Sequence, residues 1–181
     1  LAELWKMIVD EPERIIEEYS FYWNGQLEDP AKYFRDVREI YNNTKSPSAL
    51  LYLVARCVKN AVRFNGNGEF NQGADNRRLG MKPEKLEKEV KAMSRLLKGK
   101  ISIKGCDFRQ AISQATDKDL VYMDPPWQGT SGKRDPRYAY LLNIDELIEE
   151  LDSLNKRNVP FMLSFDGTCG DKSYGSDLPD Y

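Results

Sequence analysis

The chain has 181 residues, of which 40% are hydrophobic and 31% are charged, as is typical of a folded globular protein with a sizeable core. Its formal net charge of −2 at pH 7 excludes a globally basic nucleic-acid binder, although it leaves room for a local basic surface. The chain contains no histidine, which excludes Ser–His and Cys–His catalysis and histidine-ligated metal sites, so no metal centre is expected.

The first 60 residues are predicted to be helical throughout. Apolar residues recur at helical spacing in "LAELWKMIVDEPERIIEEYS" at the start of the chain. Two further helices are each expected to begin with a capping residue followed by proline, Asp29–Pro30 in the first and Ser46–Pro47 in the second. The segment after Pro47 is mostly apolar, which predicts a buried helix.

The segment 63–80, "RFNGNGEFNQGADNRRLG", has four glycines and four asparagines and few aliphatic residues. This composition predicts a loop or a short hairpin, and such a length inside a compact domain is typical of a functional loop. An amphipathic helix, "KPEKLEKEVKAMSRLLKG", follows it and is expected to end at Gly99. The chain therefore divides into a mainly helical region, residues 1–99, and a second region, residues 100–181.

The second region alternates between the patterns of strands and helices. A short strand leading to a turn is predicted within residues 101–108, and further strands over 119–124 and 159–167. Helices are predicted over residues 109–115 and 143–158, the last capped by Asn143. This alternation is typical of an α/β fold with a parallel sheet. Asp107, Asp124 and Asp166 each follow one predicted strand, so three carboxylates are expected at the sheet edge where ligands bind. Aspartate is also common in loops and caps, which is the alternative explanation.

Three sequence motifs resemble those of one enzyme family. "DPPW", Asp124–Trp127, resembles the Asp/Asn/Ser-Pro-Pro-aromatic motif of the amino-methyltransferases. "RFNGNGEFN", Arg63–Asn71, is similar to the R-x-N-x-x-G-E-F-N segment of the Dam-type DNA adenine-specific (N6) methyltransferases, and "FMLSFDGTCGDKSYG" is similar to the strand and loop after their catalytic helix. The resemblance implies an incomplete Rossmann-like methyltransferase sheet in residues 100–181 and a helical target-recognition domain in residues 1–99.

The chemistry of methyl transfer explains the residue types in "DPPW". The exocyclic nitrogen of adenine is a poor nucleophile because its lone pair is delocalised into the ring. The Asp124 carboxylate and the Pro125 carbonyl can each accept one of its hydrogens, which favours a nucleophilic nitrogen and stabilises the developing positive charge. Pro125 and Pro126 hold the geometry rigidly, and Trp127 is expected to stack on an adenine flipped out of the duplex. A core position for Trp127 is the alternative.

The resemblance implies S-adenosylmethionine as the methyl donor. By that resemblance Asp107 contacts the cofactor's adenine amino group, Phe108 lies against its ring, and Asp124 lies at the same site; an N-cap aspartate followed by a buried phenylalanine is the alternative. The family's Phe-x-Gly-x-Gly loop is missing from its place upstream of the helices, because "GNGEF" does not follow a strand, and the acidic residue for the ribose is missing too. A fragment or a split protein is therefore expected, with a second chain or a missing segment completing the cofactor site.

Double-stranded DNA is the expected partner. Arginine and asparagine pair with guanine and adenine edges, and arginine and lysine bind phosphates. The expected DNA contacts are Arg63, Asn65, Asn71, Arg77 and Arg78 in the loop 63–80, and Lys133, Arg134 and Tyr138 in the segment 128–140 after the catalytic motif. A solvated polar loop without a ligand is the alternative.

The predicted function is site-specific methylation of a flipped adenine in duplex DNA, within a restriction–modification system or in a regulatory role. One alternative is an amino-methyltransferase acting on RNA or on a protein glutamine, and another is a non-catalytic DNA-binding subunit that needs a partner chain. The Arg/Asn loop favours DNA. No apolar run is long enough to span a membrane, and three widely spaced cysteines are typical of reduced thiols, so a cytoplasmic, prokaryotic or phage-like and nucleoid-associated protein is expected.

Overall fold

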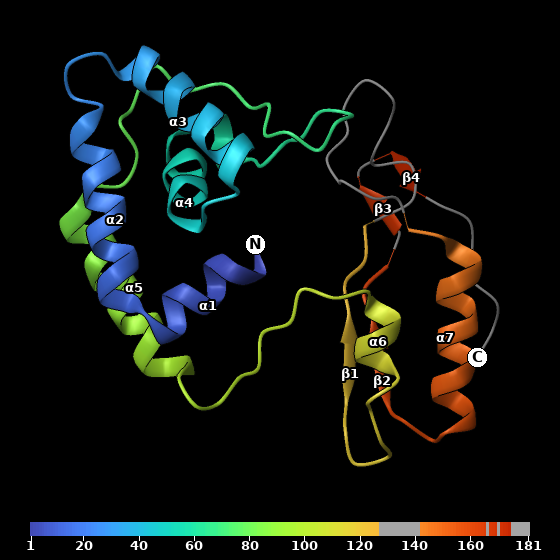
Figure 1. The fold of residues 1–181 in the computed structure, drawn as a ribbon. Helices are drawn as coiled ribbons and strands as arrows, with labels where there is room; N and C mark the ends of the chain where they lie inside the picture. Colours follow the sequence, from blue (N-terminus) through green and yellow to red (C-terminus); the bar gives the residue numbers. More distant parts are fainter. Residues whose placement is uncertain (127–141, 166, 170, 175–181) are drawn as a thin grey trace. The chain divides into compact units, whose positions relative to one another are not determined.

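The computed structural model of the protein describes residues 1–126, 142–165, 167–169 and 171–174. The chain divides into two compact units, Leu1–Gly105 and Cys106–Tyr181 (Figure 1). In the part of the chain that the structure describes, no helix combines the length and the apolar character needed to cross a membrane.

The first unit is helical, as predicted for its first 60 residues. Its elements are α1 (Ala2–Asp10), α2 (Pro12–Gly25), α3 (Pro30–Thr44), α4 (Pro47–Arg56), the short 3₁₀ helix η1 (Val58–Asn60) and α5 (Pro83–Leu97). The Asp29 side chain accepts a hydrogen bond from the Lys32 amide over 3.0 Å, and the Ser46 hydroxyl accepts one from the Ala49 amide over 3.4 Å. Both predicted cap–proline starts are therefore confirmed.

The core of the first unit lies where α2 packs against α4 and α5, and where α3 covers α4 (Figure 1). Large apolar side chains from different helices meet there, among them Ile15, Phe34 and Leu53, each at most 1% exposed. Full burial of side chains of this size contributes about 1.5–3 kcal/mol each. The Ser94 hydroxyl on α5 donates to the Val9 carbonyl at 2.7 Å and so links α5 to α1.

The segment between η1 and α5 is a loop held by two isolated bridges, Phe64 with Phe70 and Cys57 with Ala74, both antiparallel. The prediction of a loop or short hairpin is confirmed. Gly80, with a φ of +83°, allows the loop to return closely to α4, because a Cβ there would lie 3.1 Å from the Ala55 carbonyl oxygen. The end of the loop is therefore fixed against the helix that carries the core.

The second unit is a small α/β structure. Its elements are α6 (Phe108–Ile112), β1 (Val121–Met123), α7 (Ile144–Lys156), β2 (Phe161–Leu163), β3 (Gly167–Cys169) and β4 (Lys172–Tyr174). Strands β1 and β2 pair in parallel, and β3 and β4 pair antiparallel. Ile112, Leu154 and Val159 form the buried centre of the unit, whereas Tyr122 and Met162, opposite each other in the β1–β2 register, are 62% and 57% exposed.

The α/β class, a parallel strand pair and the helix capped by Asn143 are confirmed; the Asn143 side chain accepts from the Asp145 amide at 3.1 Å. The strand predicted over residues 101–108 is wrong. Residues 101–105 have no strand neighbour among the described residues, and Ile101 is 43% exposed, so neither ladder hydrogen bonds nor burial stabilise an extended pairing. Phe108 instead begins α6, and Asp107 follows no strand.

Candidate active site and DNA interface

Asp124 lies at the edge of the sheet where two parallel strands end together. Met123 of β1 is opposite Leu163 of β2, and the Ser164 amide donates to the Met123 carbonyl at 2.9 Å, so the chain leaves both strands at the same level. Asp124 is exposed there, and Pro125 and Pro126 are half-buried. Among the described residues, none bonds the Asp124 carboxylate. The sheet therefore presents a carboxylate followed by two rigid proline residues.

Asp107 caps helix α6. Its carboxylate accepts hydrogen bonds from the Arg109 backbone amide over 3.0 Å and from the Arg109 Nε over 2.9 Å. The side-chain hydrogen bond from Arg109, followed by the one from its backbone amide, lowers the pKa of Asp107. Phe108 is half-buried against the small core around Ile112. The N-cap interpretation of Asp107 is therefore confirmed, whereas Phe108 is half-buried and not fully buried as that interpretation expected.

The same two residues keep the features that an adenine ring would need. The Asp107 side chain is still 43% exposed after capping α6, and its carboxylate has more lone pairs than the cap uses. The half-buried Phe108 leaves part of its ring accessible. These residues fit the adenine end of S-adenosylmethionine. The described residues hold no glycine-rich turn after a strand, so they provide nothing comparable for the methionine end.

In the loop of the first unit, the Asn65 side chain shapes the turn. Its Oδ1 accepts from the Asn67 and Glu69 amides at 2.9 and 3.0 Å, and its Nδ2 donates to Glu69 Oε2 at 2.6 Å. Asn71 is exposed, and its amide donates to the Arg63 carbonyl at 2.8 Å. Arg63 is half-buried. The loop therefore holds the backbones of Arg63 and Asn71 next to each other.

The loop is anchored to α3 through Phe70, which is 1% exposed. The Asn42 side chain makes two hydrogen bonds to the Phe70 backbone. Its Oδ1 accepts from the Phe70 amide at 2.7 Å, and its Nδ2 donates to the Phe70 carbonyl at 3.2 Å. Tyr41 and Phe64 contact the Phe70 ring edge-on. The anchor lies inside the helical unit, so the loop has a defined shape there.

At the other end of the loop, the buried Asp75 carboxylate organises two arginines. Arg77 donates to it from its backbone amide at 3.0 Å and from Nε at 3.3 Å, and the Arg78 Nε lies 3.1 Å from it. The backbone and side-chain hydrogen bonds from Arg77 lower the pKa of Asp75. Arg78 also donates to Asn60 Oδ1 at 2.6 Å, whereas the Arg77 side chain is 87% exposed. Arg78 braces the loop, and Arg77 points into solvent.

Sequence reasoning missed the buried side chains that bond the backbone around these arginines. Arg56, 1% exposed, donates to the carbonyls of Asp75 and Arg78, and its Nε donates to Gln26 Oε1. Gln26, which is 0% exposed, donates in turn to the Leu79 carbonyl at 3.0 Å. A charged residue at the end of a mostly apolar helix was the available signal for Arg56. Lys59 was missed as well; it lies beside Arg77 and Arg78 in a shallow cavity.

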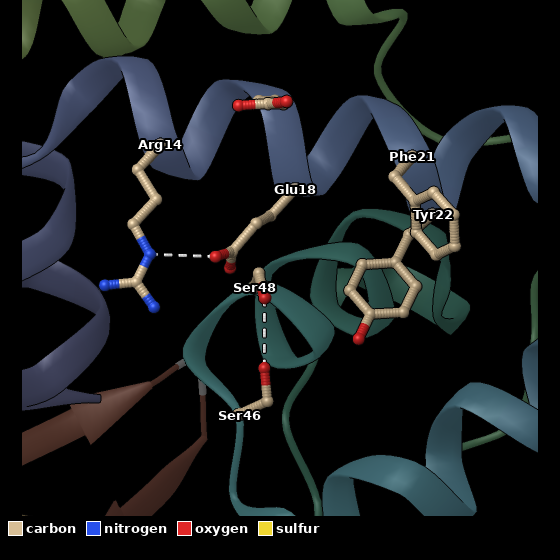
Figure 2. A pocket seen from close by; sticks show the side chains of 7 residues that line it. Arg14, Glu18, Phe21, Tyr22, Ser46 and Ser48 are labelled. Atoms are coloured by element: carbon tan, nitrogen blue, oxygen red, sulfur yellow. Dashed lines mark hydrogen bonds and ion pairs between the residues drawn. The ribbon is translucent and has the colours of Figure 1, made fainter.

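A separate cavity of about 600 Å³ lies between α2 and the start of α4 (Figure 2). The Arg14 Nε pairs with Glu18 at 2.9 Å, and Ser46 and Ser48 share a hydrogen bond of 3.0 Å. Burial opposes ionisation of Glu18, but the hydrogen bonds from Ser48 and Arg14 prevail and lower its pKa. These polar groups bond to one another, and we therefore assign no function to this cavity.

Four of the predicted site residues, Trp127, Lys133, Arg134 and Tyr138, lie outside the described residues, as does Asp166. Their roles stay predictions. In the described ranges no cluster of three or more cysteine, aspartate or glutamate side chains could hold a metal ion.

Comparison with known proteins identifies the family. The family model of the D12 class N6 adenine-specific DNA methyltransferases matches residues 1–176. The Type II methyltransferase M.FokI of Planomicrobium okeanokoites is 31% identical over 158 residues, which cover 84% of this chain and 24% of that protein. The Type II methyltransferase M1.LlaDCHI of Lactococcus lactis subsp. cremoris is 26% identical over 137 residues, 70% of this chain and 46% of that protein.

The chain thus spans less than half the length of either relative. The match with the family model covers both units, from the helices of the first to the sheet that carries Asp124. The resemblance to the Dam-type adenine methyltransferases is confirmed, and the chain belongs to the D12 class of N6 adenine-specific DNA methyltransferases.

Proposed function

We propose that the protein containing this chain transfers a methyl group from S-adenosylmethionine to the N6 nitrogen of an adenine in duplex DNA. The observation that supports this most is the exposed Asp124 carboxylate, followed by Pro125, at the edge where β1 and β2 end together. Ligands of parallel α/β sheets bind at that edge. Membership of an adenine-specific family supports the substrate.

In the proposed mechanism, two oxygen atoms bind the target amino group. The Asp124 carboxylate accepts one N6 hydrogen and the Pro125 carbonyl accepts the other, so the nitrogen lone pair is directed away from the ring. Because the φ of Pro125 is fixed near −65°, its carbonyl keeps its position as the nitrogen becomes tetrahedral. S-adenosylmethionine, when bound, supplies a methyl group on a positively charged sulfur. Asp124 stabilises the positive charge that develops on N6. That charge disappears when N6 gives up its surplus proton.

The remaining residues of the catalytic unit support this arrangement in the proposal. Trp127 stacks on the flipped adenine, which offsets part of the few kcal/mol needed to unstack it from the duplex. Asp107 and Phe108 contact the adenine end of the cofactor. We infer that the sheet is part of a Rossmann-like methyltransferase fold, with a further segment or a second chain completing the cofactor site. The exposed face that carries Tyr122 and Met162 supports this, because parallel sheets are usually covered on both faces.

The first unit is proposed to be the target-recognition domain. Arg63 and Asn71 on the loop reach base edges, and Arg77 reaches a phosphate. Asn65 and Arg78 serve the interface by holding the loop in shape, since their side chains bond within the protein. Lys133, Arg134 and Tyr138 contact the DNA from the catalytic unit. Sequence-specific reading then comes from side chains on a fixed loop.

The family does not favour RNA or a protein glutamine as the substrate, or a chain without catalytic function. Both relatives are named Type II methyltransferases, which supports a restriction–modification role for this protein. We infer a cytoplasmic location beside the nucleoid, since duplex DNA is the proposed substrate.

The test is transfer of an isotopically labelled methyl group to unmethylated duplex DNA by the full-length protein. The DNA is then digested to nucleosides, which are separated and identified by mass spectrometry. The proposal expects the label in N6-methyladenine, at one recognition sequence. Label in methylcytosine, or transfer to RNA or protein but not to DNA, would overturn the proposal.

A further inference from the structure

A surface of the first unit gathers positive charge around the predicted DNA contacts Arg77 and Arg78, and it includes three lysines that sequence reasoning did not single out. We call the five cations Lys59, Arg77, Arg78, Lys82 and Lys85 the basic strip. They line two cavities that share Asn60 and Arg78. Among the described residues, only one carboxylate, that of Asp75, lines either cavity. The chain has 29 acidic against 27 basic residues, so this local excess of positive charge is a feature of the surface and not of the composition.

The single carboxylate does not cancel the strip. Asp75 is buried, and the hydrogen bonds from Arg77 lower its pKa further below neutral pH, so it is ionised there. Five cations and one carboxylate leave a local charge of about +4 at the surface. In the part of the chain that the structure describes, no carboxylate lines the cavity that holds Lys82 and Lys85. The strip therefore attracts an anionic partner.

The two cavities differ in chemistry. The described residues that line the one around Lys59 and Arg77 are all polar or charged. The other, about 620 Å³, has an apolar floor that includes Val54, Met81 and Leu86, with Lys82 and Lys85 beside it. A partner that occupies both presents charge along its whole length and some apolar surface at one end. The phosphates and deoxyribose rings of a nucleic-acid strand have this composition.

The strip is held in place from below. Arg56 and Gln26 bind the carbonyls of Asp75, Arg78 and Leu79, and the Tyr19 hydroxyl donates to the Met81 carbonyl at 2.6 Å. The backbone between Asp75 and Met81 is thus bonded to buried side chains at four of its seven residues. A surface fixed before binding loses less conformational entropy when its partner arrives.

We propose that the basic strip binds the phosphate backbone of duplex DNA beside the loop 63–80, with Lys59, Lys82 and Lys85 as phosphate contacts. The proposal rests on the proposed function and deepens it, because it locates the backbone contact on the helical unit. Phosphate contacts of this kind fix the position of the protein on the duplex and carry no sequence information. The apolar floor lies against deoxyribose.

The test compares two lysines of the same helix α5, both exposed. Lys85 belongs to the strip and Lys88 does not. Lys85→Gln and Lys88→Gln change the net charge equally, so a non-specific effect of charge affects both alike. The double variant Lys82→Gln/Lys85→Gln and the variant Lys59→Gln extend the comparison. Binding of a fluorescent duplex of about 25 base pairs to the full-length protein is titrated at several salt concentrations, with circular dichroism as the control of folding.

Each phosphate contact removed is expected to reduce the slope of log K against log[salt] by about 0.9. Lys85→Gln and Lys59→Gln should each lower the slope by about that amount, and the double variant by about twice as much, with Lys88→Gln unchanged. Equal slopes for Lys85→Gln and Lys88→Gln would overturn the proposal. A second result would also overturn it: the strip variants bind duplex DNA as well as the wild type does but no longer bind poly-L-glutamate. The surface would then serve an acidic protein. A wild-type protein that binds no duplex at any salt concentration refutes the proposed function itself.

Discussion

The Nε of Arg56 donates to the Oε1 of Gln26 over 2.7 Å, and both side chains are buried in the helical unit. The Tyr52 hydroxyl donates to the same oxygen at 3.2 Å, so the Gln26 amide must direct its Nε2 the other way, to the Leu79 carbonyl. A cation on α4 and an amide just after α2 therefore hold the end of a loop 19 to 53 positions further along the chain. This pair links the core to the proposed DNA interface.

Arg56→Met is expected to reduce the free energy of unfolding by about 3–5 kcal/mol. The substitution keeps a long apolar stem but leaves the carbonyls of Asp75 and Arg78 without their buried donor. Urea titration followed by circular dichroism measures the loss, with Arg95→Met on the exposed side of α5 as the matched control. A loss below about 1 kcal/mol for Arg56→Met would show that the loop does not depend on this support.

Asn42→Ala tests the anchor at the other end of the loop. It removes both hydrogen bonds to the Phe70 backbone, so we expect a loss of about 1–3 kcal/mol and faster hydrogen exchange at the Phe70 amide. The neighbouring Asn43 is exposed, and Asn43→Ala is the control on the same helix. Exchange at Phe70 that is equally slow in both variants would contradict the anchor.

The sequence predicted local features well because their causes lie within a few residues. Asp29, Ser46 and Asn143 each cap a helix through a bond to the second or third residue after them, and each was predicted. The Arg56–Gln26 pair joins residues 30 positions apart, and no local pattern signals it. The strand predicted over 101–108 failed for a related reason, since a strand needs a partner that the sequence of that strand does not specify.

The candidate site was predicted to a similar extent. The position of Asp124 after a strand follows from the run of apolar residues before it, and the structure has it there. The sequence left Asp107 with two interpretations because a cap and a ligand contact require the same residue type. The structure resolves the cap through Arg109, a residue that sequence reasoning did not weigh.

Asp75 gives the loop a dependence on acid pH. Because the hydrogen bonds from Arg77 lower its pKa, its contribution to stability is complete above the ordinary aspartate pKa of about 3.9 and is lost as the pH falls through the lowered value. Asp75→Asn should therefore be less stable than the wild type at pH 7, and the difference should shrink below about pH 4. Urea midpoints of both proteins at pH 7 and pH 3 measure this, and a difference independent of pH would refute it.

Tyr52 gives the core a dependence on alkaline pH. Burial raises the pKa of Tyr52 to about 12, so the neutral phenol is favoured in the folded protein. Its contribution is complete below the ordinary tyrosine pKa of about 10 and is lost as the pH rises towards 12. Tyr52→Phe should flatten the fall in unfolding midpoint between pH 9 and pH 11. The same alkaline slope in wild type and Tyr52→Phe would show that another group controls it.

The proposed binding of the adenine amino group by Asp124 and the Pro125 carbonyl is tested most directly by the single-turnover rate of methyl transfer by Asp124→Ala. The substitution removes one of the two proposed acceptors of the N6 hydrogens, so we expect the rate to fall by a factor of about 10²–10³ while the affinity for duplex DNA changes little. Asp117→Ala, at an exposed position of the same unit, should retain the wild-type rate. Wild-type methyl transfer by Asp124→Ala would contradict the account.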